Sequence, residues 1–229
     1  MEIDKIPLFT SPAVFGLHSN AEIQYFSNSV KELWTNTLLM QTSDGAAAGG
    51  GNREEYITKV ASDIQEKLPA EFDIFNIRKK FETPSPTQIV LLQELERFNI
   101  LLKLISVSLF DLKRALVGEI GMSSALDSLS GTMFNGGVPA DWLRIAPQSL
   151  KNLVGWIEHF LRRYKQYKAW DEVEEPKVIW LSGLHIPASY LTALVQMTCR
   201  SKGWALDKST LYTVVLKERD PSKITKRID

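Results

Sequence analysis

The residues of this sequence best suited to chemistry are its single cysteine and its three histidines. A histidine close to a cysteine can lower the pKa of the thiol and make the nucleophilic thiolate available. Cys199 and His185 lie in one stretch, WLSGLHIPASYLTALVQMTCRSKGW at 180–204, and His159 is the other candidate base. This stretch is therefore either a Cys-His nucleophilic site or an element of architecture.

Helical periodicity in the same stretch favours architecture. We predict a helix with Pro187 in its first turn, Lys202 near its end and Gly203 after it. On this helix Cys199 shares a face with apolar side chains, and a thiol buried in apolar surroundings is inert. We interpret Cys199 as a core thiol and His185 as a packed or hydrogen-bonded turn residue. The apolar residues on that face are Leu191, Leu194 and Val195.

Other patterns also lack the features of catalytic, metal or cofactor sites. The histidines show no HxxxH spacing, and no CxxC pair exists, so we expect no metal site. The glycine-rich segment 43–52 lacks the Lys-Ser/Thr of a phosphate-binding loop, so we expect a flexible loop and no nucleotide. The carboxylates at 172–175 fit a solvated turn. Basic pairs such as Arg162-Arg163 fit a solvated face, with protein docking as the alternative.

Overall composition narrows the class of partner. Lys plus Arg and Asp plus Glu each number 27, so no global field attracts nucleic acid or an anionic membrane. A single cysteine excludes an internal disulfide framework and fits a reducing compartment. The N-terminal residues lack an apolar signal-peptide core, and the longest apolar run, 100–110, is interrupted by Lys103. We therefore expect no signal peptide and no transmembrane segment.

Apolar periodicity predicts a mainly α fold, a multi-helix bundle with one long central helix. Between Pro86 and Gly118 the helical period is unbroken, which predicts a helix of about 30 residues and roughly 45 Å. Asn20 is placed to cap a first helix, and Ser123 or Ser124 a later one. Further helices are expected at 21–41, at 56–68, at 73–81 and from Ser123 or Ser124 to before 135. A short turn or helix is expected from 138. The last of this set is expected at 149–167, and its apolar stripe begins at Leu150.

A short α/β segment is expected near the C-terminus. Residues 177–181 and 209–217 have the composition of strands. Nothing after the second of these supplies a pairing partner, and an unpaired strand leaves a row of open amides. The sequence is therefore expected to be a piece of a larger β structure.

Several motifs in order along the sequence resemble the C-terminal region of dynein heavy chains, and more specifically the axonemal type of cilia and flagella. The form WLSGLHIPASYLTALVQ carries the axonemal resemblance. The motifs are FGLHSNAEI (15–23), GGGNREE (49–55), LQELERFNILL (92–102), MSSALDSL (122–129), VPADW (138–142), SLKNLVGWIEHFLRRYKQYKAW (149–170) and VIWLSGLHIPASYLTALVQMTCRSKGWALDKSTLYT (178–213).

The resemblance implies a non-catalytic part of an ATP-driven, minus-end-directed microtubule motor, which packs on the AAA+ ring. It implies no cofactor in this chain, with ATP and Mg in the ring, and a location in the cytoplasm, the cytoskeleton and the ciliary or flagellar axoneme. The implied partners are AAA+ modules, intermediate and light chains, and the microtubule through the whole motor, with no nucleic acid and no membrane. The alternative is a free-standing helical adaptor that docks on dynein or another ciliary complex.

The same resemblance divides the sequence into a lead-in and first helix at 1–42, a loop at 43–53, a helical body at 54–170, and a strand-turn-helix at 171–229. That last part would lead into a β-barrel which the sequence lacks. We expect no catalytic, cofactor or metal residues, and a set of residues with packing roles. This set comprises Trp142, Trp156, Trp180, Leu184, His185, Pro187, Tyr190, Leu191, Leu194 and Trp204.

Overall fold

The computed structural model describes residues 16, 18–40, 53–172, 175–215, 217–218 and 223–224. The protein divides into two compact units, Met1–Gly50 and Gly51–Asp229. Within the described residues the secondary structure is helical, which confirms the mainly α prediction. Almost all of the glycine-rich segment 43–53 lies outside the described residues, and the four-part division expected from the sequence stays a prediction.

The first unit contains helix α1, Ser19–Met40. This helix carries large apolar side chains that are more than half exposed, among them Phe26 and Trp34. Asn20 lies inside the helix, so the expected cap at this position is wrong. The amide of Asn20 instead donates to Nδ1 of His18, 3.2 Å away, because the side chain just before the helix can reach the first free amides.

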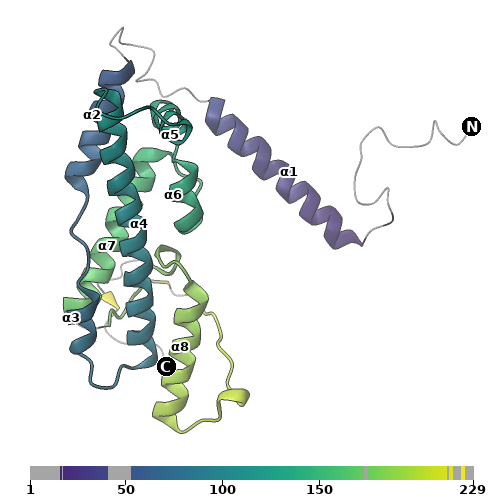
Figure 1. The fold of residues 1–229 in the computed structure, drawn as a ribbon. Coiled ribbons are helices and arrows are strands. Elements are labelled where there is room, and N and C mark those ends of the chain that lie inside the picture. The colour runs from purple at the N-terminus through teal and green to yellow at the C-terminus, as the bar shows by residue number, and fades with distance from the viewer. Residues whose placement is uncertain are drawn as a thin grey trace, which may run out of the picture. The chain divides into compact units, whose positions relative to one another are not determined.

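The second unit is built around helix α4, Pro86–Leu116, the long helix predicted from the sequence (Figure 1). Ser85 and Gln88 form a capping box at its start, with Ser85 N donating to Gln88 Oε1 at 2.8 Å. Its inward face is continuous from Val90 to Leu112 and almost fully buried. Helix α4 contacts every other α-helix of this unit: α2 (Arg53–Lys67), α3 (Ile74–Lys79), α5 (Ser124–Phe134), α6 (Ala140–Ile145), α7 (Leu153–Glu172) and α8 (Pro187–Lys202).

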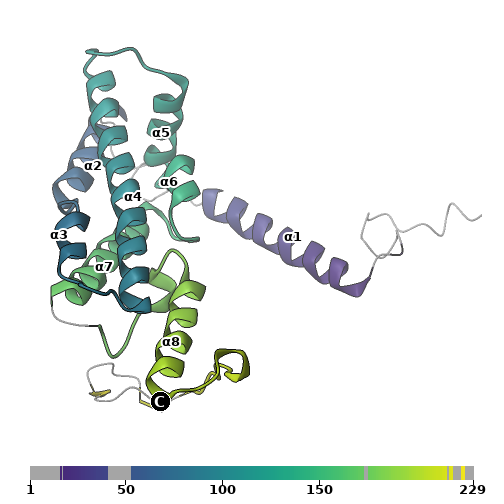
Figure 2. The same ribbon diagram turned by 60° about the horizontal axis from the view of Figure 1, so that its bottom comes forward.

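Two views of the second unit show how the helices surround α4 (Figures 1 and 2). Helices α2 and α4 run side by side, and α5 and α6 lie near the C-terminal end of α4. Helix α8 packs against the N-terminal half of α4, which begins at Pro86. The last α-helix of the sequence is thus brought back onto the helix predicted to be central.

Most helix ends follow the capping signals in the sequence. Ser123 caps α5 by accepting from the amide of Leu126, and Gly203 ends α8 with a φ of 67°. The start of α7 differs from the expectation of Ser149, because Asn152 Oδ1 accepts from the amide of Gly155 at 3.0 Å and caps the helix there. Leu150 consequently precedes the helix and is 68% exposed, so its predicted place in the apolar stripe is wrong.

The two predicted strands are not found in the described residues, so the short α/β segment is wrong. Residues 177–180 are irregular, and a 3₁₀-helix, η3, follows at Leu181–Gly183. Gln166 explains the first difference, because its side chain takes the backbone groups of Trp180 that a strand would use. Residues 209–215 are irregular after a second 3₁₀-helix, η4 (Leu206–Lys208), and have no partner strand among the described residues.

A row of stacked aromatic rings joins three helices in the core. Trp142 of α6 stacks on Trp156 of α7 with ring centroids 5.7 Å apart, and Trp156 stacks on Phe160 at 6.0 Å. Phe160 stacks in turn on Phe98 of α4 at 4.6 Å. The indole of Trp142 is also fixed by a 3.0 Å hydrogen bond to Ser108 Oγ. The aromatic row therefore sets the positions of α6 and α7 against the central helix.

Candidate functional site: a buried carboxylate that fixes the start of helix α8

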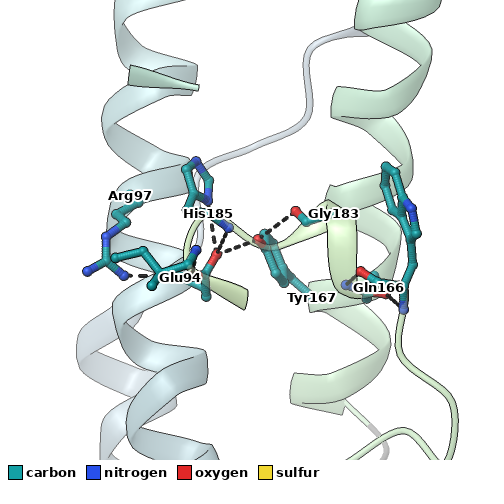
Figure 3. Close-up of polar contacts among 8 residues, drawn as sticks. Glu94, Arg97, Gln166, Tyr167, Gly183 and His185 are labelled. Atoms are coloured by element: carbon teal, nitrogen blue, oxygen red, sulfur yellow. Dashed lines mark hydrogen bonds and ion pairs between the residues drawn. The ribbon is translucent and has the colours of Figure 1, made fainter. Parts of the chain in front are cut away.

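The carboxylate of Glu94, whose side chain is fully buried on α4, binds groups from several elements of the second unit (Figure 3). Its Oε2 atom accepts from Tyr167 Oη at 2.8 Å and from the backbone amide of His185 at 2.6 Å. His185 Nδ1 lies 3.0 Å from the same oxygen. The Oε1 atom accepts from the amide of Ile186 at 3.0 Å. Glu94 thus joins α4, α7 and the segment that leads into α8.

The amides that Glu94 binds belong to His185 and Ile186, the two residues immediately before α8. A carboxylate at this end both accepts from the amides and interacts favourably with the helix dipole. Tyr167 Oη also lies 3.3 Å from the carbonyl oxygen of Gly183, the last residue of η3. We define Glu94, Tyr167 and His185 as the Glu94 cluster, which holds the turn before α8 onto α4 and α7.

The electrostatics of the cluster favour a permanently ionised Glu94. Burial alone would raise the pKa of this carboxyl. Hydrogen bonds from the His185 ring, the amides of His185 and Ile186, and Tyr167 more than offset burial and lower the pKa to about 2. Burial, together with the charge and hydrogen bond of Glu94, raises the pKa of Tyr167. Neither group therefore exchanges a proton near neutral pH, and the arrangement serves to hold elements together.

Two arginines supply positive charge near the cluster. Arg97 Nη1 lies 3.7 Å from Glu94 Oε1, one helical turn further along α4. Arg163 of α7 is 2% exposed, and its guanidinium pKa is lowered by burial, partly offset by Tyr167 and Glu94. Within the described residues no hydrogen-bond partner meets its Nε or Nη1 atoms. The two arginines therefore add positive charge near a carboxylate that hydrogen bonds already stabilise.

The structure does not bring the residues of the possible Cys-His site together. His185 precedes α8, whereas Cys199 is buried near the C-terminal end of that helix. Helical rise places them about 20 Å apart along the helix axis. The third candidate, His159, instead packs its ring against Trp180 at a centroid distance of 5.0 Å. Among the described residues, no three His, Cys, Asp or Glu side chains are grouped so as to hold a metal ion.

The residues expected to pack fall into three groups. Trp142, Trp156, Leu184 and Tyr190 are buried, and the ring of Tyr190 meets that of Trp170 at 5.5 Å. Trp204 differs from the expectation, because it follows the turn at Gly203 and is 60% exposed. The half-buried group comprises Trp180, His185, Pro187, Leu191 and Leu194, although the side chain of His185 itself is only 4% exposed.

Sequence reasoning missed Glu94, Tyr167 and Gln166. Its assignment of Arg163 to a solvated face is wrong, because this side chain packs inside the bundle and is 2% exposed. A signal for Glu94 is present, since it lies three residues after Leu91 and four residues before Phe98, both on the buried face of α4. A carboxylate at a core position of a helix needs donors from other elements. The residues that bind Glu94 lie 73 to 92 residues further along the sequence, so no local pattern predicts which of them it meets.

The indole of Trp180 packs directly on Gly183. A Cβ atom on Gly183 would overlap the indole carbons of Trp180. We expect Gly183→Ala to lower the free energy of unfolding by about 2 kcal/mol, because the ring would have to move in a packed site. Gly131→Ala is the control, since its Cβ would lie 3.6 Å from the flexible end of Arg53 and alanine favours the helix. Equal urea midpoints for the two variants would contradict this assignment.

An exposed apolar stripe follows the side of α4 that faces away from the core. We name Ile100, Val107, Phe110 and Val117 the α4 stripe, and their exposed fractions lie between 49% and 68%. Spacings of seven and three residues place Ile100, Val107 and Phe110 on one face of the helix, and Val117 is the residue that follows its last turn. Exposed apolar side chains gathered on one face are typical of an interaction surface. No helix in the described part of the protein is long and apolar enough to cross a membrane.

Comparison with known proteins confirms the resemblance found in the sequence. Residues 27–229 match the model of the C-terminal domain of the dynein heavy chain. This chain is 52% identical over 225 residues to the dynein-1-alpha heavy chain of the flagellar inner arm I1 complex of Chlamydomonas reinhardtii, a match to 98% of this chain and 5% of that protein. It is 49% identical over 226 residues to human dynein axonemal heavy chain 10, with the same coverage of both proteins.

A more distant relative extends the pattern. The chain is 34% identical over 221 residues to the dynein beta chain of the flagellar outer arm of Chlamydomonas reinhardtii, a match to 95% of this chain and 5% of that protein. It thus spans 5% of the length of these three relatives. With a family match that runs from within α1 through α8 and beyond, this chain belongs to the family of C-terminal domains of dynein heavy chains.

Proposed function

We propose that this chain is the non-catalytic C-terminal part of an axonemal dynein heavy chain and that it packs on the AAA+ ring of a microtubule motor. The named relatives include flagellar inner-arm and outer-arm chains and an axonemal chain, and this supports a place in the axoneme. The geometric observation that carries the packing role is the α4 stripe, because an exposed apolar helical face is typical of a surface that a protein partner covers.

The proposal places the chemistry of the motor outside this chain. ATP and Mg bind in the ring, and the motor's movement toward microtubule minus ends uses the whole heavy chain. The ring's AAA+ modules are the direct partners, the intermediate and light chains belong to the same complex, and neither nucleic acid nor membrane is a partner. The Glu94 cluster supports this role, since its groups fix helices, and neither Glu94 nor Tyr167 titrates near neutral pH.

Regular spacing in the α4 stripe supports a helical partner. Ile100, Val107 and Phe110 follow steps of seven and three residues, the spacing by which one helix presents a seam to another. Lys103 lies between them on the same face and is exposed. A partner helix with apolar residues at matching steps and a carboxylate near Lys103 would complement this surface.

The role of the α4 stripe is tested by measuring the affinity of the 229-residue chain for a purified motor from which the corresponding C-terminal part has been removed. We expect Phe110→Glu to weaken binding at least about tenfold, because a carboxylate would be buried against an apolar surface. Phe75→Glu is the matched control, since Phe75 is 68% exposed on α3 and lies outside the stripe. Both variants should keep the thermal unfolding midpoint of the unmodified protein.

The two parts of the proposal fail separately. If the unmodified protein does not bind the motor, packing on the ring is contradicted. If it binds and Phe110→Glu binds equally well, another surface makes the contact. An immunoblot with an antibody against residues 54–170 tests whether this chain is part of a dynein heavy chain. A band at heavy-chain size, enriched in axonemes, is expected, whereas a band at the size of the 229-residue chain would favour a free-standing adaptor.

A further inference from the structure

A second surface of this unit combines positive charge with an aromatic ring on the outer face of α7. The guanidinium carbon of Arg162 lies 4.4 Å from the ring centroid of Trp180, and the ring of His159 meets the same indole at 5.0 Å. Lys165 follows Arg162 by three residues on the exposed face of α7, and Lys151 precedes the helix and is also exposed. We name Lys151, His159, Arg162, Lys165 and Trp180 the basic platform.

The aromatic part of the platform is held rigidly. Gln166 Oε1 accepts from the backbone amide of Trp180 at 2.7 Å, and Gln166 Nε2 donates to the Trp180 carbonyl oxygen at 3.4 Å. Gly183 leaves no Cβ where the indole packs. Because Arg162 stacks on this fixed ring, its guanidinium loses less conformational freedom when it binds a ligand. The pair of Arg162 and Trp180 is therefore organised before any partner arrives.

The positive charge of the platform is not neutralised by ion pairs within the described residues. No ion pair between these residues involves Lys151, Arg162 or Lys165. The pKa of His159 is lowered by burial and then by the charges of Lys151, Arg163 and Arg162, with Glu158 acting in the opposite direction. Buried Arg163, which lacks a hydrogen-bond partner at Nε and Nη1 among the described residues, adds to the positive field.

We propose that the basic platform binds an acidic peptide segment of a protein partner. Arg162 presents the edge of its planar guanidinium for a two-point contact with one carboxylate, and Lys165 binds a second carboxylate. Trp180 supports this contact by holding Arg162 against its ring. This surface lies on α7 and does not depend on the α4 stripe or on packing against the ring.

Charge and size favour an acidic peptide over a membrane or a nucleic acid. The sequence as a whole has equal numbers of positive and negative side chains, so no long-range field draws the protein to a polyanionic surface. The platform is small, and exposed Glu158 lies one helical turn before Arg162 on α7, where it would repel a dense array of phosphates. A short peptide can place its carboxylates on Arg162 and Lys165 and avoid Glu158.

The proposal is tested with a fluorescein-labelled oligoglutamate peptide and the full 229-residue protein, by fluorescence anisotropy. We expect saturable binding that weakens as ionic strength rises to about 0.15 M. Arg162→Gln should weaken binding about tenfold, because a charge-assisted hydrogen bond is lost. Arg162→Lys should recover only part of the loss, since lysine keeps the charge without the planar two-point geometry.

Lys59→Gln is the matched control, because it removes one exposed positive charge from α2 and leaves the platform unchanged. An equal loss in Lys59→Gln and Arg162→Gln, or no saturable binding by the unmodified protein, would overturn the proposal. Phosphatidylserine vesicles and inorganic phosphate are competitors. Tighter binding to the vesicles, or full displacement of the peptide by phosphate at an equal concentration of charge, would also overturn it. None of these results bears on binding of the protein to the motor through the α4 stripe.

Discussion

Phe98→Ala is expected to lower the free energy of unfolding of the second unit by about 4 kcal/mol. Phe98 is fully buried on α4. Its ring stacks on Phe160 at 4.6 Å and also meets the rings of Phe72, Tyr164 and Tyr167. Removal of the ring would leave a cavity between helices that the surrounding aromatic rings cannot fill.

Urea unfolding, followed by circular dichroism, measures this effect. Phe110→Ala is the matched control, since it removes the same side chain from the same helix at a position that is 53% exposed. We expect the control to change the free energy of unfolding by no more than about 0.5 kcal/mol. Similar losses for the two variants would show that burial does not decide the contribution of a phenylalanine on α4.

The helices could be predicted from the sequence because their signals are local. The capping box of Ser85 and Gln88 lies within one turn, and the apolar period of α4 runs without an internal glycine or proline as far as Leu116. Pro187 and Gly203 likewise mark the two ends of α8. The prediction for the start of α7 is wrong because Ser149 and Asn152 are both good caps, and only packing of the helix decides between them.

The strand predictions are wrong because strand preference depends on neighbours that the sequence does not reveal. Residues 177–181 contain the β-branched and aromatic side chains typical of a strand. In the fold, Gln166 of α7 binds both backbone groups of Trp180, although it lies 14 residues earlier in the sequence. A local pattern cannot indicate that a side chain from a packed helix will replace the hydrogen bonds of a strand partner.

The partners of Glu94 could not be predicted from the sequence for a related reason. Its hydrogen bonds join Glu94 to Tyr167, His185 and Ile186 across separations of 73 to 92 residues. The motif around His185 predicts a turn, but the reason for its conformation lies on α4. A carboxylate in the apolar phase of a long helix is therefore the local feature that points to such a cluster.

Glu94→Gln is expected to lower the free energy of unfolding by about 3 kcal/mol. Glu94 Oε2 faces donors from Tyr167 and from the amide of His185, and Oε1 faces the amide of Ile186. A glutamine side chain has one acceptor oxygen in place of two. Its NH₂ group would face the donors on one side, and those donors would lose their acceptor. Glu96→Gln is the control, because Glu96 lies on the same helix and is exposed.

The effect of Glu94→Gln should depend on pH in a defined direction. The pKa of Glu94 falls from an ordinary value of 4.5 to about 2 in the folded state, so protons bind the unfolded state more readily. The stabilisation from this group, about 3 kcal/mol, is complete above the unfolded pKa and is lost as pH falls toward the folded pKa. The difference in unfolding free energy between the unmodified protein and Glu94→Gln should therefore narrow between about pH 4.5 and pH 2.

Urea titrations at a series of pH values measure this narrowing directly. The unmodified protein and Glu96→Gln should lose stability in parallel as the pH is lowered, because both keep the buried carboxylate. A Glu94→Gln variant with the same midpoint as Glu96→Gln at neutral pH would contradict the role of the cluster. The difference in unfolding free energy between the unmodified protein and Glu94→Gln could instead stay constant down to about pH 2. That result would show that Glu94 stabilises the fold through its shape and packing and not through its charge. The two outcomes separate a carboxylate that fixes the start of α8 electrostatically from one that only fills space between α4 and α7.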